Sequence, residues 1–383
     1  MGTSARELVT EPPALAEEQI SLVRLRNQCI AAPTAALEGA GERSCAGPRA
    51  VVERLGALQG QDYAGVLWSI GLRIPGVTAS DVERAFADRE IVRTWPMRGT
   101  LHVIPAADAR WMLELLTPRV IERTARRREN LALDREEIAR AAKLFEGALR
   151  GGNRLTREEM MALLENSGIV TAGQRGYHLL FHLSMQRLIN FGPRAGTQQT
   201  FVLFDEWLPR SHSLPRSEAL AILVRRYFTS HGPASVKDFV GWSGLSVADA
   251  KAGLADNADT LVARKLGGAV YWMSHDPSAV TTGSAMPTTV PDVHLLPGFD
   301  EYLLGYKDRS AQLSSAHSEL IVPGGNGVFR PTVVVDGQVV GTWKRVGKKG
   351  AVTVEATPFG KFTATQQHAI DSATKRYLAF IAE

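Results

Sequence analysis

Cysteine is scarce in this chain, which has only Cys29 and Cys45 among its 383 residues. The two cysteines make no CxxC motif and no disulfide framework, so their number fits a reducing compartment. Zinc-ligand spacing is missing, as are a GxGxxG after a strand, a Walker loop, HExxH and GxSxG. We therefore expect neither a bound metal nor a cofactor.

Long apolar runs are missing too, since no stretch reaches the ~18 residues that span a membrane. Residues 1–15 lack the apolar core of a secretory signal and contain acidic residues and prolines, which predicts a disordered tail. These features predict that the protein has no membrane partner. We expect it in the bacterial cytoplasm, at the nucleoid.

Charge is nearly balanced over the whole chain, but two segments are strongly basic. The formal charge is +4 and the pI about 9.1, which permits a polyanionic partner without requiring one. Each basic segment is either a solvated face or a contact for such a partner. The two clusters are Arg126, Arg127 and Arg128 within residues 118–130, and Lys344, Arg345, Lys348 and Lys349 within residues 343–349.

A unit of three helices and a two-stranded ribbon occurs twice in the middle of the chain. In residues 135–204 the helical stretch REEIARAAKLFEGAL is followed by NRLTREEMMALLENSGI, GYHLLFHLSMQRLINFG and a turn-rich ribbon. Residues 216–274 repeat this order. Thr156 and Ser235 are predicted N-caps, because each is followed three positions later by an acidic residue that can close a capping box. Helix, helix, helix, ribbon is the winged-helix arrangement.

A looser copy of this unit precedes both, with its ribbon predicted at residues 91–105. The C-terminal segment changes to strands joined by tight turns, followed by a helix. We therefore predict an α+β, mainly helical fold with three tandem winged-helix units and a C-terminal β-rich part. The predicted boundaries are a disordered tail at 1–15, winged helices at 16–117, 118–210 and 211–275, and a β-meander with a closing helix at 276–383.

The stretch LQGQDY places Gln59 and Gln61 on either side of Gly60, inside an otherwise apolar, helix-like segment. Residues two apart on an ideal helix point about 200° apart, so both amides can face one ligand only if the backbone leaves the helix there. Gly60 would make such a departure inexpensive. Alternatively, one amide caps a loop and the other is solvated.

Three further polar residues stand among apolar neighbours. His102 lies on the predicted first ribbon, where a structural role is the default. Asp300 and Glu301 are adjacent carboxylates. Neighbours in sequence point apart on a strand or a helix, so these two do not make an acid/base pair by themselves.

Four segments together resemble the AlkZ/YcaQ-type winged-helix DNA glycosylase family, which includes the azinomycin-resistance DNA glycosylase. They are LQGQDYAGVLWSIGLR, RTWPMRGTLHVIPAADARWML, LLPGFDEYLLGYKDR and NGVFRPTVVVDGQVVGTWKR, in the same order as in the family. The resemblance implies that the three winged helices form a concave basic surface for duplex DNA. The family's catalytic motif is glutamine, an aliphatic residue, then glutamine or aspartate. Gln59 and Gln61 match its outer positions, whereas Gly60 stands where the family has the aliphatic residue.

The resemblance implies a monofunctional glycosylase of base excision repair, acting as a monomer on alkylated double-stranded DNA. Its substrates would be purines alkylated at N7, with bulky natural-product adducts and interstrand crosslinks among the candidates, as in antibiotic self-resistance. Such a base is cationic and leaves without an enzyme acid, so the amides need only position the water. The basic clusters would bind phosphates. The residues of the first ribbon that would approach the lesion are Arg98, Thr100 and His102.

Two other functions stay open at this point. One is a non-catalytic winged-helix protein, either a transcriptional regulator or a damage-binding factor; the other is a protein that sequesters a drug. The geometry of Gln59 and Gln61 discriminates among them. If both side chains face one basic groove, the enzyme is favoured. If either side chain is buried, the interpretation as an enzyme is weakened.

Overall fold

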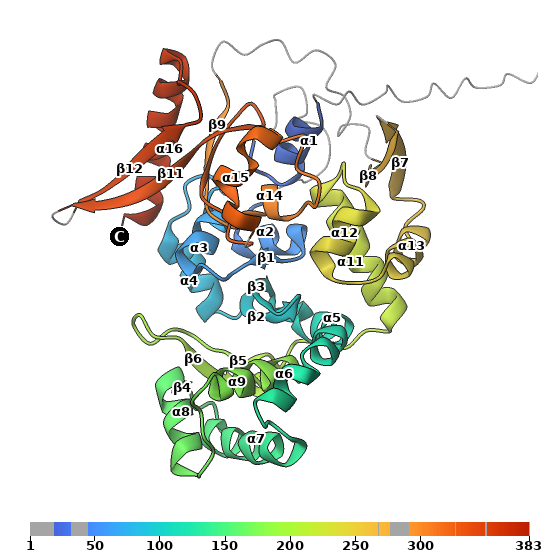
Figure 1. The fold of residues 1–383 in the computed structure, drawn as a ribbon, viewed down its shortest axis with the longest axis vertical. Coiled ribbons are helices and arrows are strands. Elements are labelled where there is room, and N and C mark those ends of the chain that lie inside the picture. Colours follow the sequence, from blue (N-terminus) through green and yellow to red (C-terminus); the bar gives the residue numbers. More distant parts are fainter. Residues whose placement is uncertain are drawn as a thin grey trace, which may run out of the picture.

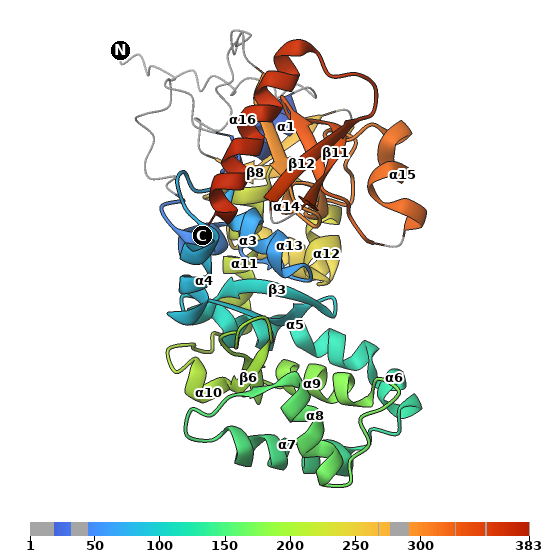
Figure 2. The ribbon, with the colours of Figure 1, turned by 90° about the vertical axis from the view of Figure 1, so that its left-hand side faces the viewer.

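The computed structural model describes residues 19–31, 45–266, 268–275, 291–325, 327–348 and 351–382. The predicted tail at 1–15 and Lys349 lie outside these residues, as does the segment 276–290. The fold is α+β: helices dominate, and every sheet is small and antiparallel (Figures 1 and 2). This confirms the α+β, mainly helical class that the sequence predicts.

The first part of the chain forms four helices and a three-stranded sheet in the order β1-β3-β2. The ribbon predicted at residues 91–105 is the hairpin β2–β3, while the short strand β1, which pairs with β3, was not predicted. Its elements are α1 (Ile20–Asn27), α2 (Pro48–Leu55), β1 (Leu58–Gln59), α3 (Tyr63–Gly71), α4 (Ala79–Ala87), β2 (Ile91–Met97) and β3 (Thr100–Pro105).

The second part is joined to the first by the helix α5, and in it three helices, α7, α8 and α9, precede the hairpin of β5 and β6, with the short strand β4 between α7 and α8. Thr156 caps α8 in a capping box with Glu159, as predicted, because the Thr156 hydroxyl and the Glu159 carboxylate satisfy each other's free backbone N–H. The predicted helix at 135–149 is α7. The elements are α5 (Ala109–Arg123), α6 (Ala125–Asn130), α7 (Arg135–Leu149), β4 (Leu155–Thr156), α8 (Arg157–Asn166), α9 (Arg175–Met185), β5 (Ile189–Phe191), β6 (Thr200–Leu203) and α10 (Phe204–Trp207).

The third part has three helices and a two-stranded ribbon. Ser235 caps α12 in a capping box with Asp238, which confirms the second predicted N-cap. The elements are α11 (Arg216–His231), α12 (Val236–Ser243), α13 (Val247–Ala255), β7 (Leu261–Leu266) and β8 (Ala269–Ser274).

The C-terminal part is the predicted meander and closing helix, with strand order β12-β11-β10-β9. Strand β9, which was not predicted, adds the edge opposite β12. The elements are β9 (Val293–Leu296), α14 (Glu301–Leu304), α15 (Ser318–Ile321), β10 (Thr332–Val335), β11 (Gln338–Lys348), β12 (Ala351–Pro358) and α16 (Ala364–Ile381). Of the helices in the described part of the chain, none has the length and apolar character that a bilayer crossing requires.

Three hydrophobic cores meet at the β2–β3 hairpin. Val103 belongs to a core shared by the first and C-terminal parts, in which Trp68 and Tyr377 make an edge contact with ring centroids 5.1 Å apart. Ile104 belongs to the core of α5 and the third part, and Trp95 to the core of the second part. Because successive side chains of a strand point to opposite faces, one hairpin can serve several cores. The hairpin accordingly lies in the middle of the molecule (Figure 1).

Candidate active site around Gln59 and Gln61

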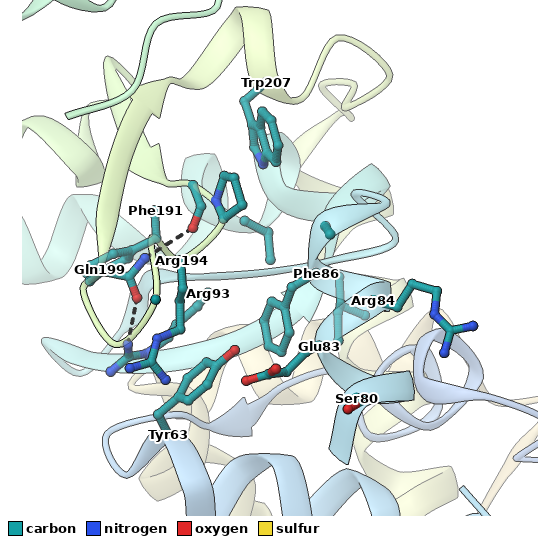
Figure 3. A pocket seen from close by; sticks show the side chains of 16 residues that line it. Tyr63, Ser80, Glu83, Arg84, Phe86, Arg93, Phe191, Arg194, Gln199 and Trp207 are labelled. Atoms are coloured by element: carbon teal, nitrogen blue, oxygen red, sulfur yellow. Dashed lines mark hydrogen bonds between the residues drawn. The ribbon is translucent and has the colours of Figure 1, made fainter. Parts of the chain in front are cut away.

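The backbone is not helical at residues 58–61, which is the condition that the sequence set for both amides to face one ligand, and main-chain hydrogen bonds hold it in place. Gln59 lies opposite His102 in the β1–β3 pair. The Gly60 N–H donates to the carbonyl of Leu101 at 2.8 Å, and its own carbonyl accepts the Arg93 Nε–H at 2.8 Å. Figure 3 shows Arg93 reaching also to Gln199, to whose Oε1 it donates at 3.1 Å. The loop is therefore fixed by its backbone.

Gly60 is not needed for the conformation itself, contrary to the reason given from sequence. Its φ lies outside the left-handed region, and a Cβ added there would be 3.4 Å from Val103 Cγ2 and 3.6 Å from Arg93 Nε. Both are contacts that side chains ordinarily make. The loop is therefore held in place even without a side chain at position 60, because two hydrogen bonds to the Gly60 backbone fix it.

The two amides have different surroundings. Gln59 is only 9% exposed, and its buried Oε1 has no hydrogen-bond partner among the described residues. Gln61 is exposed, and its Oε1 accepts the Leu101 N–H at a long 3.4 Å. The two side chains therefore do not both open onto one groove, and by the criterion set from the sequence the burial of Gln59 weakens the case for an enzyme.

Glu301 holds the backbone of Gln59 from the C-terminal part of the chain. One carboxylate oxygen accepts the Gln59 N–H at 3.1 Å, and the other accepts the Trp242 Nε1–H at 2.9 Å. The Nε2 of His231 lies 3.5 Å from the second oxygen. Glu301 is fully buried. It links α12 and α14 to the glutamine loop.

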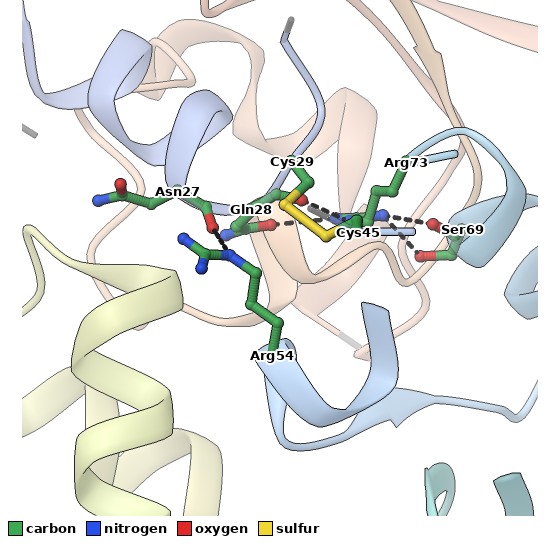
Figure 4. The surroundings of a disulfide bond; sticks show 7 residues. All are labelled: Asn27, Gln28, Cys29, Cys45, Arg54, Ser69 and Arg73. Atoms are coloured by element: carbon green, nitrogen blue, oxygen red, sulfur yellow. Dashed lines mark hydrogen bonds between the residues drawn. A yellow bond between two sulfur atoms is a disulfide. The ribbon is translucent and has the colours of Figure 1, made fainter. Parts of the chain in front are cut away.

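Its neighbour Asp300 serves a separate network. Both of its oxygens accept from Arg73, at 2.8 and 2.9 Å, and Ser69 donates to it at 2.6 Å. Burial opposes ionisation of Asp300, but the Arg73 ion pair and the hydrogen bonds from Ser69 and the Tyr302 N–H together outweigh it and lower the pKa of the carboxyl group. Arg73 also donates to the backbone and side-chain oxygens of Gln28, at 2.9 and 3.1 Å (Figure 4). Asp300 and Glu301 thus contact different groups, as expected for neighbours in sequence.

A disulfide lies beside this network and corrects the sequence prediction about cysteine. Cys29, which follows α1, is bonded to Cys45, with their Cα atoms 6.7 Å apart (Figure 4). The cysteine count therefore gives no support to a reducing compartment. The sequence could not show the pairing, because it depends on how the chain around α1 folds back onto the region before α2.

His102 is a structural residue and does not reach the surface, which corrects its place among the predicted DNA contacts. It is fully buried; its Nδ1–H donates to the Thr100 carbonyl at 2.9 Å, and Nε2 accepts from Arg98 at 3.0 Å. Burial and the nearby Arg98 lower the pKa of His102 to about 3, so the ring is neutral at pH 7. Burial also lowers the pKa of Arg98. Thr100 is half-buried, and its hydroxyl has no partner among the described residues.

The two basic clusters lie in different parts of the molecule. In Figures 1 and 2, α6 lies with α7–α9, at the opposite end from β11. Arg126 and Arg127 are exposed on α6, where Arg127 donates to Gln174 at 2.8 Å, while Arg128 donates to the Ile121 carbonyl at 2.9 Å.

On β11, Lys344 and Arg345 are exposed, and Lys344 forms a 2.8 Å ion pair with Glu355 across to β12. Lys348 is described only as the last residue of β11. The five cationic side chains described on these two elements do not form one cluster, because Arg126, Arg127 and Arg128 lie on α6 whereas Lys344 and Arg345 lie on β11.

Sequence reasoning missed the residues that support the loop. Arg93 and Glu301 act on it through the backbone, across 33 and 242 positions. No local pattern marks either residue as a partner of Gln59 or Gly60.

The class of protein can now be stated. Residues 52–380 match the family described as "DNA glycosylase AlkZ-like". The match covers most of the chain, so the protein belongs to the AlkZ-like family of DNA glycosylases and is an enzyme of that class.

A relative and a solved structure, both from Streptomyces sahachiroi, are similar to it. The "Interstrand DNA cross-link repair glycosylase" of Streptomyces sahachiroi is 27% identical over 328 residues, which cover 79% of this chain and 83% of that protein. The solved structure of the "Streptomyces sahachiroi DNA glycosylase AlkZ" superposes with a TM-score of 0.73 at 23% identity, covering 96% of this chain and 97% of that one. The second similarity shows that the fold is shared.

Proposed function

We propose that this protein is a monofunctional DNA glycosylase that hydrolyses the N-glycosidic bond of purines alkylated at N7. Bulky adducts and interstrand crosslinks are candidate substrates, in keeping with the name of the Streptomyces relative, an interstrand DNA cross-link repair glycosylase. The observation that carries the proposal is the loop of Gln59 and Gln61. Its backbone is held at three points, by Glu301, Leu101 and Arg93.

The amides would position the water that attacks the anomeric carbon. Gln61 is already exposed, so its amide can meet DNA without rearrangement. Gln59 must turn its amide toward the DNA. Its Oε1 breaks no hydrogen bond in doing so, since it has no partner among the described residues. With the backbone of the loop held in place and the amide of Gln59 turned toward the DNA, the amide oxygen would accept a hydrogen bond from the attacking water.

The absence of a carboxylate at these two positions fits a cationic leaving group. A purine alkylated at N7 carries its own positive charge, so its departure needs no protonation by the enzyme. Positioning alone can lower a barrier by up to ~7–11 kcal/mol. A carboxylate would add charge stabilisation and admit poorer leaving groups. We therefore propose an enzyme that spares normal bases.

The three helix-and-ribbon units are proposed to be winged helices that together form a concave surface for duplex DNA. The proposed boundaries are those predicted from sequence, with a monomer acting on DNA in the bacterial cytoplasm. Among the predicted phosphate contacts, the exposed side chains are the best placed, and we retain Arg126, Arg127, Lys344 and Arg345. Arg98 and Thr100 are proposed to approach the lesion only if the hairpin shifts, because both are partly buried.

The test is release of base from a duplex oligonucleotide carrying one 7-methylguanine. Wild-type protein should release 7-methylguanine and leave an abasic site, whereas Gln59→Ala and Gln61→Ala should each release it at least tenfold more slowly. Arg225→Ala, which removes an exposed arginine of α11, is the control. Absence of release by the wild type, or equal release by the glutamine variants, would overturn the proposal.

A further inference from the structure

A cavity of about 340 Å³ borders the glutamine loop (Figure 3). Its walls come mainly from α3, α4 and β2 on one side and from the loop between β5 and β6 on the other. Exposed residues, Ser80 and Gly196 among them, belong to its lining, so the cavity is open to solvent. Arg93, which also lines it, donates to the carbonyl of Gly60. A group bound in this cavity would therefore lie beside the candidate catalytic loop.

Two arginines, Arg93 from β2 and Arg194 from the β5–β6 loop, point to the same end of the cavity (Figure 3). Their guanidinium carbons lie 5.7 and 4.4 Å, respectively, from the centroid of the Tyr63 ring. Burial, and to a lesser extent the charge of Arg194, lower the pKa of Arg93 to about 10, which leaves it charged at pH 7. The protein thus holds two cationic side chains beside one aromatic ring.

No carboxylate is ion-paired with either of these cations. Among the residues that the structure describes, no ion pair includes them. The carboxylates of Asp62 and Glu83 are near enough to act on this end of the cavity electrostatically, but both side chains are exposed. Arg84, an exposed arginine in the lining, differs in this respect, because it forms an ion pair of 2.5 Å with Asp81. The arginine pair is therefore available to an anion from outside the protein.

The hydrogen bonds of the two arginines leave donors for a ligand. Arg93 donates from Nε to Gly60 and from Nη1 to Gln199, and its Nη2 makes no hydrogen bond to a described residue. Arg194 donates to the carbonyl of Thr197. A guanidinium is a planar fork that can donate to two oxygens of one phosphate, and burying a cation is costly until an anion pairs with it. A phosphodiester therefore fits this pair better than a neutral group does.

We propose that Arg93 and Arg194 together bind one phosphodiester of the lesion-bearing strand, close to the alkylated nucleotide, and that this phosphate holds the glutamine loop in place through Arg93. The Gly60 carbonyl that Arg93 contacts lies between the two candidate catalytic amides. Phosphate contacts set the register of a protein on DNA, so this contact would place the target nucleotide at the loop. The inference rests on the proposed glycosylase function and adds the contact that aligns its substrate.

The experiment measures the coupling between Arg194 and single phosphates of the DNA. Each duplex carries one 7-methylguanine on a 2′-fluoro sugar, which makes the glycosidic bond resist hydrolysis, and one phosphate of the lesion strand is replaced by a neutral methylphosphonate. The replaced phosphate moves one step along the strand from one duplex to the next. Fluorescence anisotropy gives the affinities of the wild type, of Arg194→Ala and of the matched control Arg84→Ala, which removes an arginine that is already paired with Asp81.

At one position near the lesion, the methylphosphonate should weaken binding by the wild type about tenfold, because a charge-assisted hydrogen bond is lost. Arg194→Ala should bind the unmodified duplex about tenfold more weakly, and the methylphosphonate at that position should weaken it no further. Arg84→Ala should keep the sensitivity of the wild type. Additive losses at every position would overturn the inference. If saturable binding of inorganic phosphate that Arg194→Ala abolishes accompanies such additive losses, the site takes a free phosphate instead of DNA.

Arg93→Lys tests whether the phosphate acts on the loop. Lysine keeps the charge but lacks the planar fork, so it cannot hold the Gly60 carbonyl and the phosphate in one fixed geometry. The variant should bind the 2′-fluoro duplex within about threefold of the wild type, yet release 7-methylguanine from an ordinary duplex about tenfold more slowly in a single turnover. Release at the wild-type rate would overturn the coupling to the loop. Because the phosphate contact itself is measured without hydrolysis, its outcome is separate from failure of the proposed function, which is absence of release by the wild type.

Discussion

The backbone N–H of Gln59 donates a 3.1 Å hydrogen bond to the carboxylate of Glu301, although the two residues are 242 positions apart. The other oxygen of Glu301 accepts from Trp242. A fully buried carboxylate is stable only when its oxygens are hydrogen-bonded, and here both are. The candidate catalytic loop is therefore positioned by the third and C-terminal parts of the chain.

Replacing Glu301 with glutamine should loosen this loop. An amide has one accepting oxygen and one donating nitrogen, so it cannot accept from both Gln59 and Trp242. One buried donor loses its partner, and we expect the free energy of unfolding to fall by about 1–3 kcal/mol. Release of 7-methylguanine in a single turnover should slow about tenfold, equivalent to ~1.4 kcal/mol in the barrier.

The control is Glu136→Gln, which makes the same change at an exposed position of α7. Urea unfolding and single-turnover rates of both variants separate the two effects. A Glu301→Gln protein that is destabilised but cleaves at the wild-type rate would show that Glu301 stabilises the fold without positioning the loop.

Gly60 should accept a methyl group, whereas Gly71 should not. A Cβ at Gly60 would make ordinary contacts with Val103 and Arg93, so Gly60→Ala should change the unfolding free energy by less than ~1 kcal/mol. A Cβ at Gly71, on α3, would overlap the ring of Phe380 on α16, and such overpacking typically costs about 1–3 kcal/mol. Thermal unfolding of the two variants, side by side, is the measurement. Equal destabilisation by both would show that Gly60 is conformationally required after all.

Arg126 and Arg127 should contribute to DNA affinity through phosphate contacts. Each contact releases counterions, so the logarithm of the binding constant should depend less steeply on the logarithm of salt concentration by about one for each arginine removed. Anisotropy titrations of the Arg126→Ala/Arg127→Ala variant over a series of salt concentrations measure this slope. Arg128→Ala should change it less, because the Arg128 guanidinium is bound to Ile121 and Thr124. An unchanged slope in the double variant would place α6 outside the DNA interface.

Local patterns in the sequence predicted most of the elements. Capping boxes at Thr156 and Ser235 and the apolar periodicity of 135–149 depend on neighbours within a few positions, and the structure has them as predicted. The supports of the glutamine loop depend on partners far away in the chain. Strand β1 exists only because β3 pairs with it, and Glu301 becomes a partner of Gln59 only when the first and C-terminal parts of the chain have packed together.

Burial was the other property that the sequence did not give correctly. Arg98, Thr100 and His102 of the first ribbon were expected to approach the lesion, but three cores meet at this ribbon and enclose His102. The alternation of side chains along one strand predicts that the strand has two faces. It does not reveal that other parts of the chain bury both faces. The same limit explains why Gln59 and Gln61, so alike in sequence, differ in exposure.

The burial of His102 should make the protein less stable in acid. The pKa of His102 is lowered from 6.5 to about 3 in the folded protein, first by burial and then by Arg98. Below pH 6.5 His102 binds a proton in the unfolded chain but not in the folded protein. This contribution to stability is therefore complete above pH 6.5 and is lost as the pH falls from 6.5 toward 3, by up to about 1.4 kcal/mol per pH unit.

Substituting His102 with glutamine should flatten this dependence, since glutamine does not titrate. Urea unfolding at several pH values between 7 and 5 should give a shallower fall for His102→Gln than for the wild type, even if the variant is less stable at pH 7 after losing its Arg98 contact. Some slope should remain, because burial and Arg128 also lower the pKa of His182 to about 4. His368→Gln, at an exposed position of α16, is the matched control. Equal slopes for His102→Gln and wild type would mean that His102 gains a proton in the folded protein as readily as in the unfolded chain.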